Sequence, residues 1–310
     1  MTFTLIKITK YILGFLLLTL SEPEFGDRID RGLVVHDSLQ ELSGLAASRK
    51  NPGVLWTHND SGGKNRIYAI DSNGRHLGTF VIAGVRARDW EDIAVGPGPV
   101  KGQQYLYIGD IGDNRSRYDL KYIYRIPEPE INLDEAPIEL ILRDAETITC
   151  QYPDGRRDAE TIMVDPLTKD IYIISKRESN VRVYRAPFPQ STSQVVTLEY
   201  TATLNLHNVV GGDISSTGDE IIIKTYGEIY YWSKSSNEDC SEVFGKKPVS
   251  VPYIPEPQGE AVCWQVDGLG YYTISEKVGG IQSHLYFYPR LNTSALGKSK
   301  PHSSTLKISP

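Results

Sequence analysis

The sequence predicts an all-β protein, and specifically a β-propeller with five blades, a six-bladed ring being the alternative. Three observations favour this class. Short runs rich in Val, Ile and Tyr alternate with turns of Gly, Asp, Asn and Pro. No segment after residue 25 has the periodicity of an amphipathic helix of about ten residues or more. A pattern of about fifty residues recurs five times along the chain.

The recurring unit begins with a strand that carries an acidic motif. Arg88–Val95 reads RDWEDIAV and Arg157–Val164 reads RDAETIMV, so five of eight positions are identical. DAETI also occurs at Asp144–Ile148, but that copy leads into a strand that closes at a turn. We therefore assign it to the outer strand of the preceding unit. Three weaker copies align on the glutamate: Glu41–Ala47 (ELSGLAA), Val210–Ser216 (VGGDISS) and Gln258–Trp264 (QGEAVCW).

Each acidic strand is followed by a hydrophobic strand that ends in polar residues, then by a third strand and a less regular fourth. Units of four strands are typical of propeller blades, which are stable only when they stack on their neighbours. Two packed β-sandwiches are the alternative architecture. The expected second strands are 54–60, 105–110, 171–176, 221–225 and 271–276, and the third strands are 66–70, 121–126, 181–186, 228–232 and 284–288.

The two ends of the chain have separate roles in this interpretation. The fifth unit lacks an outermost strand of its own, and we expect Gly32–His36 to supply it and remove a free sheet edge. The propeller then spans 27–290, and 291–310 form a flexible tail. Residues 1–21 contain Lys7, Lys10 and the apolar run Tyr11–Leu20, which predicts a secretory signal peptide, with a short uncleaved anchor as the alternative.

Composition narrows the possible partners and compartments. The formal net charge of −6 argues against a general nucleic-acid binder, which normally has a basic face. Three cysteines allow at most one intramolecular disulfide, and we expect Cys150 and Cys263 to be buried in strands. We predict a secreted, monomeric protein without a transmembrane span after processing. Its Asn-x-Ser/Thr sequons, at Asn59, Asn114 and Asn292, are usable only in a glycosylating compartment.

The acidic motifs predict a metal site, because the first strand of every propeller blade lines the central channel. Side chains two residues apart share one strand face, so the glutamates and the aspartates two residues before them converge there. Such carboxylates must be protonated, paired with bases or bridged by a cation. Oxygen ligands without histidine favour Ca²⁺, and then Mg²⁺. The predicted metal ligands are Asp89, Glu91, Asp158, Glu160, Glu260 and, if a bulge intervenes, Asp213.

The second strands end at the same mouth with polar side chains. We expect five of these to bind substrate: Lys176, Arg177, Lys224, Tyr226 and His58. The basic residues could instead neutralise the carboxylates in a salt-bridge network that only holds the blades in register, and the Arg-Asp pairs at 88–89 and 157–158 favour that alternative. The GDIGDN stretch at 109–114 is better explained by an Asx-stabilised turn than by a calcium loop.

The motifs DWED, DAET and QGEA, with HNDSG and GDIGDN at the strand tips, resemble those of secreted β-propellers of the phytase-like, paraoxonase-like and gluconolactonase-like groups. That resemblance implies calcium among inward carboxylates, with Glu91, Glu160 and Glu260 at the acidic places, and in some members ester or lactone hydrolysis. No catalytic residue can be assigned from the motifs. We predict a module that binds a small molecule or an extracellular protein, the alternative being a calcium-dependent hydrolase of phosphate or carboxylic esters; a purely structural repeat protein is a third, weaker possibility.

Overall fold

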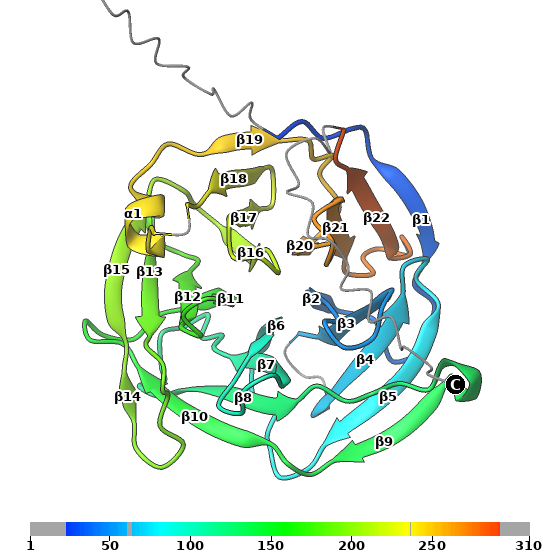
Figure 1. Cartoon of the computed structure of the whole chain (residues 1–310), viewed down its shortest axis with the longest axis horizontal. Coiled ribbons are helices and arrows are strands. Elements are labelled where there is room, and N and C mark those ends of the chain that lie inside the picture. The colour runs from blue at the N-terminus through cyan, green and yellow to red at the C-terminus, as the bar shows by residue number, and fades with distance from the viewer. Residues whose placement is uncertain (1–22, 61–63, 236, 292–310) are drawn as a thin grey trace, which may run out of the picture.

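Five small sheets stand in a ring around a central axis (Figure 1), and their strands are antiparallel except for the outermost pairs β5–β9 and β10–β14, which are parallel. The structure is a computed structural model and describes residues 23–60, 64–235 and 237–291. The innermost strands of neighbouring sheets contact one another all the way round. This arrangement confirms the five-bladed β-propeller and rules out the six-bladed and sandwich alternatives for the described residues.

Each blade runs outward from an inner strand that lines the axis. Blade 1 contains β2 (Leu42–Ala47), β3 (Val54–Asn59), β4 (Arg66–Asp71), β5 (His76–Ile82) and β9 (Ile138–Leu142). Blade 2 contains β6 (Trp90–Pro97), β7 (Gln104–Asp110), β8 (Lys121–Pro127), β10 (Glu146–Gln151) and β14 (Val196–Thr197). Blade 3 contains β11 (Ala159–Val164), β12 (Ile171–Ser175), β13 (Val181–Ala186) and β15 (Glu199–Leu204). Blade 4 contains β16 (Val209–Ile214), β17 (Glu220–Thr225), β18 (Ile229–Ser233) and β19 (Val249–Val251). Blade 5 contains β20 (Gly259–Trp264), β21 (Gly270–Ser275), β22 (His284–Pro289) and β1 (Ile29–Leu33).

The loops that lead to outer strands contain the little helix that the described residues have. A 3-10 turn, η1 (Leu133–Glu135), precedes β9, and α1 (Cys240–Phe244) lies between β18 and β19. The sequence DAETI at Asp144–Ile148 leads into β10, which is antiparallel to β8 in blade 2. It therefore belongs to the outer part of the preceding blade, as predicted. No helix in this part of the chain is long and apolar enough to cross a membrane, and the predicted signal peptide lies outside the described residues.

The hydrophobic core is divided into five clusters, and each cluster fills the space between two adjacent blades. Between blades 1 and 2, for example, Trp56, Phe80 and Trp90 are buried together. A single blade would leave both of its faces exposed, so the stability of each sheet depends on its two neighbours. All three cysteines are free and buried within these clusters.

The N-terminal segment closes the ring. β1 pairs with β22, so the first described strand completes the last blade, three residues earlier in the chain than predicted. Phe25 bridges to Arg290 and packs against the rings of Trp264 and Tyr271, with ring centroids 5.9 and 5.0 Å away. The two ends of the propeller are thus joined by hydrogen bonds and by an aromatic contact. The predicted closure by an N-terminal strand is confirmed.

Replacing Phe25 by alanine should lower the free energy of unfolding by about 3 kcal/mol, because the side chain is only 6% exposed and its loss leaves a cavity at the ring junction. Urea unfolding followed by circular dichroism measures this change. Val35 in the same segment is 66% exposed, so V35A should change the free energy by less than about 0.5 kcal/mol. Equal small effects of both substitutions would show that the junction does not hold the ring closed.

Candidate metal and ligand site at the acidic mouth of the channel

A β-bulge near the start of every inner strand aims one side chain into the channel mouth. The extra residue falls at the same place in each inner strand, and in blades 2, 3 and 5 it is Glu91, Glu160 and Glu260. A bulge leaves one residue outside the regular ladder and redirects its side chain. In blade 1 the irregularity covers Ser43 and Gly44. The glutamates that the sequence alignment placed in one column therefore occupy equivalent positions around the axis.

Blade 4 departs from the predicted alignment by two residues. Its bulge lies between Val209 and Gly211, so Val210 occupies the position of the glutamates. Asp213 lies farther along β16, where its carboxylate accepts a hydrogen bond from the Trp264 amide of blade 5 at 2.9 Å. Asp213 therefore belongs to none of the carboxylate groups at the mouth. The alignment on Gly212 was wrong because the VGGDISS copy has Val210 at the bulge, and its one acidic residue, Asp213, lies three residues farther along the strand.

Seven carboxylates gather at this mouth of the channel. Four of them, Glu91, Asp158, Glu160 and Glu260, are buried, whereas the remaining three are half-buried at the rim. Within the described residues they form three groups whose oxygens lie within 4.8 Å of one another: Asp60, Glu260 and Glu276; Asp60, Asp89 and Glu91; and Glu91, Asp158 and Glu160. Five of the six predicted ligands are thereby brought together, and Glu91 belongs to two of the groups.

Glu91 is the member of the cluster whose negative charge is least balanced by neighbouring donors and bases. Its side chain is 2% exposed, and no described residue donates a hydrogen bond or an ion pair to its carboxylate. Burial raises its pKa well above the usual value, and the nearby Glu160, Asp60 and Asp89 carboxylates raise it further. The backbone of Gly112 passes directly over it, since a Cβ at that position would lie 1.9 Å from Glu91 Oε1. Only glycine allows the backbone to approach the carboxylate this closely.

On the other side of the mouth, Lys176 neutralises part of the cluster. Its Nζ lies 2.5 Å from Glu160 Oε1 and 3.9 Å from Glu260 Oε1, and it donates to the Tyr226 hydroxyl at 3.0 Å. Tyr226 in turn donates to Glu260 at 2.6 Å. Burial nevertheless raises the pKa of Glu160 to about 8, against the opposing effect of Lys176. This half of the mouth is a hydrogen-bonded salt-bridge network, as one alternative from the sequence predicted.

Asp158 belongs to the same compensated half. Its Oδ2 lies 2.5 Å from Arg177 Nε, and its Oδ1 accepts from the Asp113 amide at 2.7 Å. The Arg-Asp neighbours in sequence do not pair with each other: Arg88 contacts Asp110 at 3.3 Å, and Arg157 contacts Asp154 and Glu178.

The GDIGDN segment forms a turn that is stabilised by its own side chains. The Asp113 carboxylate accepts hydrogen bonds from the Arg117 and Tyr118 amides at 2.7 and 2.8 Å, and it forms an ion pair with the buried Lys121 at 3.1 Å. Asp113 therefore holds the loop that carries Gly112 over Glu91. The predicted Asx-stabilised turn accounts for this geometry.

Two residues expected to bind substrate are fully buried. Lys224 donates to the carbonyls of Gly259 and Thr225 and lies over the Tyr253 ring, and burial lowers its pKa to about 8. The His58 ring packs against Trp90, and burial lowers its pKa to about 4. Both side chains lie inside the packed structure, where they tie strands together. Of the five predicted binding residues, Lys176, Arg177 and Tyr226 reach the mouth, and all three already contact carboxylates or one another.

The side chain of Asn59, the first residue of one sequon, forms hydrogen bonds within the structure. Its Nδ2 donates to the Ser38 carbonyl at 2.5 Å, and its Oδ1 accepts from the Gln40 and Glu41 amides at 3.2 Å. Asn114 is exposed, whereas Asn292 lies outside the described residues. Glycosylation of this protein stays a prediction.

Asp60 and Glu276 join the cluster although they were not predicted as ligands. Both follow second strands, at the tips that the sequence placed near the same mouth. The sequence feature that could have identified them is their position directly after a strand that pairs with an inner strand. Burial raises the pKa of Glu276 to about 7, and Glu260, Asp60 and Glu41 contribute to this shift.

Fold and site together define a five-bladed β-propeller with an acidic channel mouth. No protein-family model and no curated protein matches the sequence. Among solved structures, the chain is similar to one in a crystal structure of a nidogen/laminin complex, with a TM-score of 0.45, 12% sequence identity, and coverage of 80% of this chain and 81% of that chain. The phytase-like, paraoxonase-like and gluconolactonase-like features find no support in these comparisons, so the calcium and the hydrolase activity stay predictions.

The raised pKa of Glu276 makes a testable contribution to stability. In the unfolded chain a glutamate releases its proton near its ordinary pKa of 4.5, whereas folded Glu276 keeps it until about pH 7. Between these values the native state binds more protons, so this group's contribution to stability falls as the pH rises. We expect the free energy of unfolding of the wild type, relative to E276Q, to decrease from pH 4.5 to 7 in EDTA. An increase over this range would contradict the raised pKa of Glu276.

Proposed function

We propose that this propeller binds a hard divalent cation, Ca²⁺ in the first place, through Asp60, Asp89 and Glu91. The observation that carries the proposal is Glu91, a buried carboxylate without a donor among the described residues and beside other carboxylates. Removing such a group from water is costly unless it is protonated or paired with a cation. A bound cation would satisfy Glu91 and reduce the repulsion among its neighbours.

The size and chemistry of this group fit calcium. Ca²⁺ binds oxygen ligands at 2.3–2.6 Å, so two ligands on opposite sides of the ion lie about 5 Å apart. The oxygens of Asp60, Asp89 and Glu91 lie within 4.8 Å of one another. All three are carboxylates, and no histidine or cysteine side chain belongs to the group, which disfavours zinc. The carbonyl or water ligands that complete the shell would come from the rim of the mouth.

The ligand class follows from the same electrostatics. Lys176 and Arg177 already lie 2.5 Å from Glu160 and Asp158, so they are poor candidates for holding an anionic substrate. A cation at the rim can coordinate an oxygen-rich ligand directly, because three protein carboxylates leave part of the shell of Ca²⁺ open. We therefore propose a binding module for a small molecule or a protein loop that supplies carboxylate, carbonyl or hydroxyl oxygens. The hydrolase alternative has no geometric feature that favours it.

Removing Ca²⁺ should lower the thermal stability of the protein, since a ligand that binds only the native state raises its stability. We expect the melting temperature to fall by several degrees in EDTA and to recover with excess Ca²⁺. Glu91→Gln should abolish the response and weaken Ca²⁺ binding by at least tenfold in isothermal titration calorimetry.

Glu135→Gln removes an exposed carboxylate that belongs to none of the acidic groups, so it should leave the calcium response unchanged. Terbium luminescence provides a second measurement of cation binding that does not depend on unfolding. If E91Q binds Ca²⁺ or Tb³⁺ as tightly as the wild type, the assignment of the site to Glu91 is wrong.

A further inference from the structure

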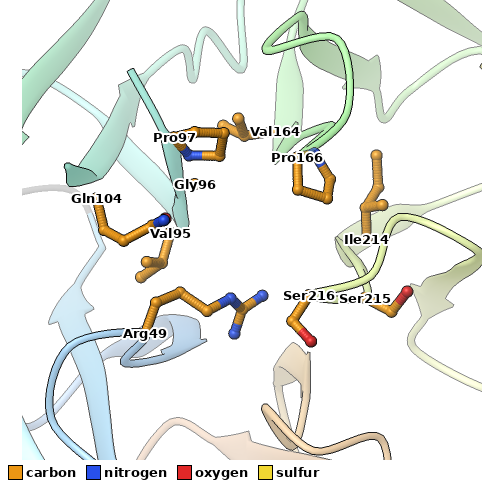
Figure 2. A pocket seen from close by; sticks show the side chains of 10 residues that line it. All are labelled: Arg49, Val95, Gly96, Pro97, Gln104, Val164, Pro166, Ile214, Ser215 and Ser216. Atoms are coloured by element: carbon orange, nitrogen blue, oxygen red, sulfur yellow. The ribbon is translucent and has the colours of Figure 1, made fainter. Parts of the chain in front are cut away.

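The opposite end of the channel contains a pocket of different chemistry. Val95–Pro97 and Ile214 lie at the ends of inner strands that begin near the acidic mouth, and they line the pocket together with Val164 and Pro166. Most of the exposed surface of the wall is polar, and the apolar side chains contribute the smaller part of it. The cavity has a volume of about 200 Å³. Figure 2 shows the Arg49 guanidinium reaching into its middle, opposite Pro97 and Pro166. Arg49 is the charged residue among those that line it, and no carboxylate belongs to its wall.

The Arg49 side chain is held in place but not neutralised. One of its terminal nitrogens donates to the Ala47 carbonyl at 3.0 Å, and its backbone amide donates to Glu128 at 3.2 Å. Within the described residues, no carboxylate lies within 4.0 Å of the guanidinium. The buried Asp213 is near enough for Arg49 to lower its pKa, but the Asp213 carboxylate is bound to the Trp264 amide. Most of the donors of the guanidinium fork therefore remain available to a ligand.

A second donor lines the same wall. The side-chain amide of Gln104 has no hydrogen-bond partner among the described residues, and Figure 2 shows it on the same side of the pocket as Arg49. The Ser216 hydroxyl donates to the Val266 carbonyl at 2.7 Å, so it can accept a hydrogen bond from a ligand but has no proton left to donate. The pocket thus offers one full positive charge and one neutral donor next to apolar side chains.

We propose that this pocket binds the carboxylate of a small organic monoanion. The planar guanidinium matches a carboxylate through two parallel hydrogen bonds, and one positive charge balances one negative charge. Phosphate at neutral pH carries more charge than a single arginine compensates. Val95, Val164 and Ile214 contribute the smaller, apolar part of the wall, which offers contact to no more than a short hydrocarbon chain behind the carboxylate. This site is at the other end of the channel and does not depend on the proposed cation site.

Two sources can supply this chemistry, a free short-chain acid and the C-terminal carboxylate of a peptide. The full chain is titrated with butyrate and with an acetylated tripeptide that ends in free valine, and binding is followed by protein NMR shifts. Butyramide and the amidated tripeptide have the same shapes without the charge. We expect binding of at least one carboxylate probe and at least tenfold weaker binding of its amide.

Arg49→Gln should weaken binding of that probe by at least tenfold, and Arg49→Lys, which keeps the charge without the fork, should weaken it less. Gln104→Leu should weaken it severalfold and tests the pocket without touching Arg49. The exposed Arg143→Gln has the same change in net charge and should bind like the wild type. Thermal melts confirm that each variant is folded.

Four results would overturn the proposal. The first is that neither carboxylate probe binds, and the second is that an amide binds as tightly as its acid. The third is that R49Q binds the probe as tightly as the wild type, and the fourth is that inorganic phosphate binds through Arg49 in preference to both carboxylates. Because none of these measurements uses a divalent cation, failure here leaves the acidic mouth to be judged by its own experiments.

Discussion

Ring closure is the constraint on which the rest of this structure depends. Each sheet is buried only between two neighbours, so the five clusters of the core exist only while the ring is closed. β1 completes the last blade, and Phe25 packs on Trp264 beside it. Closure also forces equivalent positions of the inner strands to face one axis. Three glutamates therefore meet at one mouth although the first and last are separated by most of the chain.

The acidic mouth is costly to fold, because burial and mutual repulsion both oppose ionisation of its carboxylates. The protein offsets this cost unevenly. Around Glu160 and Asp158, Lys176 and Arg177 supply positive charge from the second strand of the same blade. Around Glu91 the described residues supply no such partner, and the backbone of Gly112 packs closely against its carboxylate. This uncompensated half is the part of the mouth to which we assign the proposed cation.

The sequence predicted the architecture well because strong repeats determine register. RDWEDIAV and RDAETIMV share enough residues to align unambiguously, and their strands, β6 and β11, are equivalent in the ring. The weak copy in blade 4 lacks an acidic residue at the bulge, so Asp213 was placed two residues out of register. The burial of Lys224 could not be predicted from the sequence either, since a lysine at a strand end is normally exposed. In the structure the Tyr253 ring, which comes from the segment before the next blade, packs on Lys224, and the Gly259 and Thr225 carbonyls accept its hydrogen bonds.

Blade 4 also explains why the site is asymmetric. With Val210 at the bulge, this blade contributes no carboxylate to the acidic groups. Its Lys224 donates a hydrogen bond to the Gly259 carbonyl of the adjoining blade. The negative charge is therefore concentrated on the remaining blades, with Lys176 and Tyr226 at the boundary. At the opposite mouth, Arg49 is the charged residue of the pocket wall. Since the inner strands run in the same direction around the ring, their starts, three of which carry a glutamate, lie at one mouth and their ends lie at the other. The two ends of the ring therefore differ in charge, with clustered carboxylates at one end and the Arg49 guanidinium at the other.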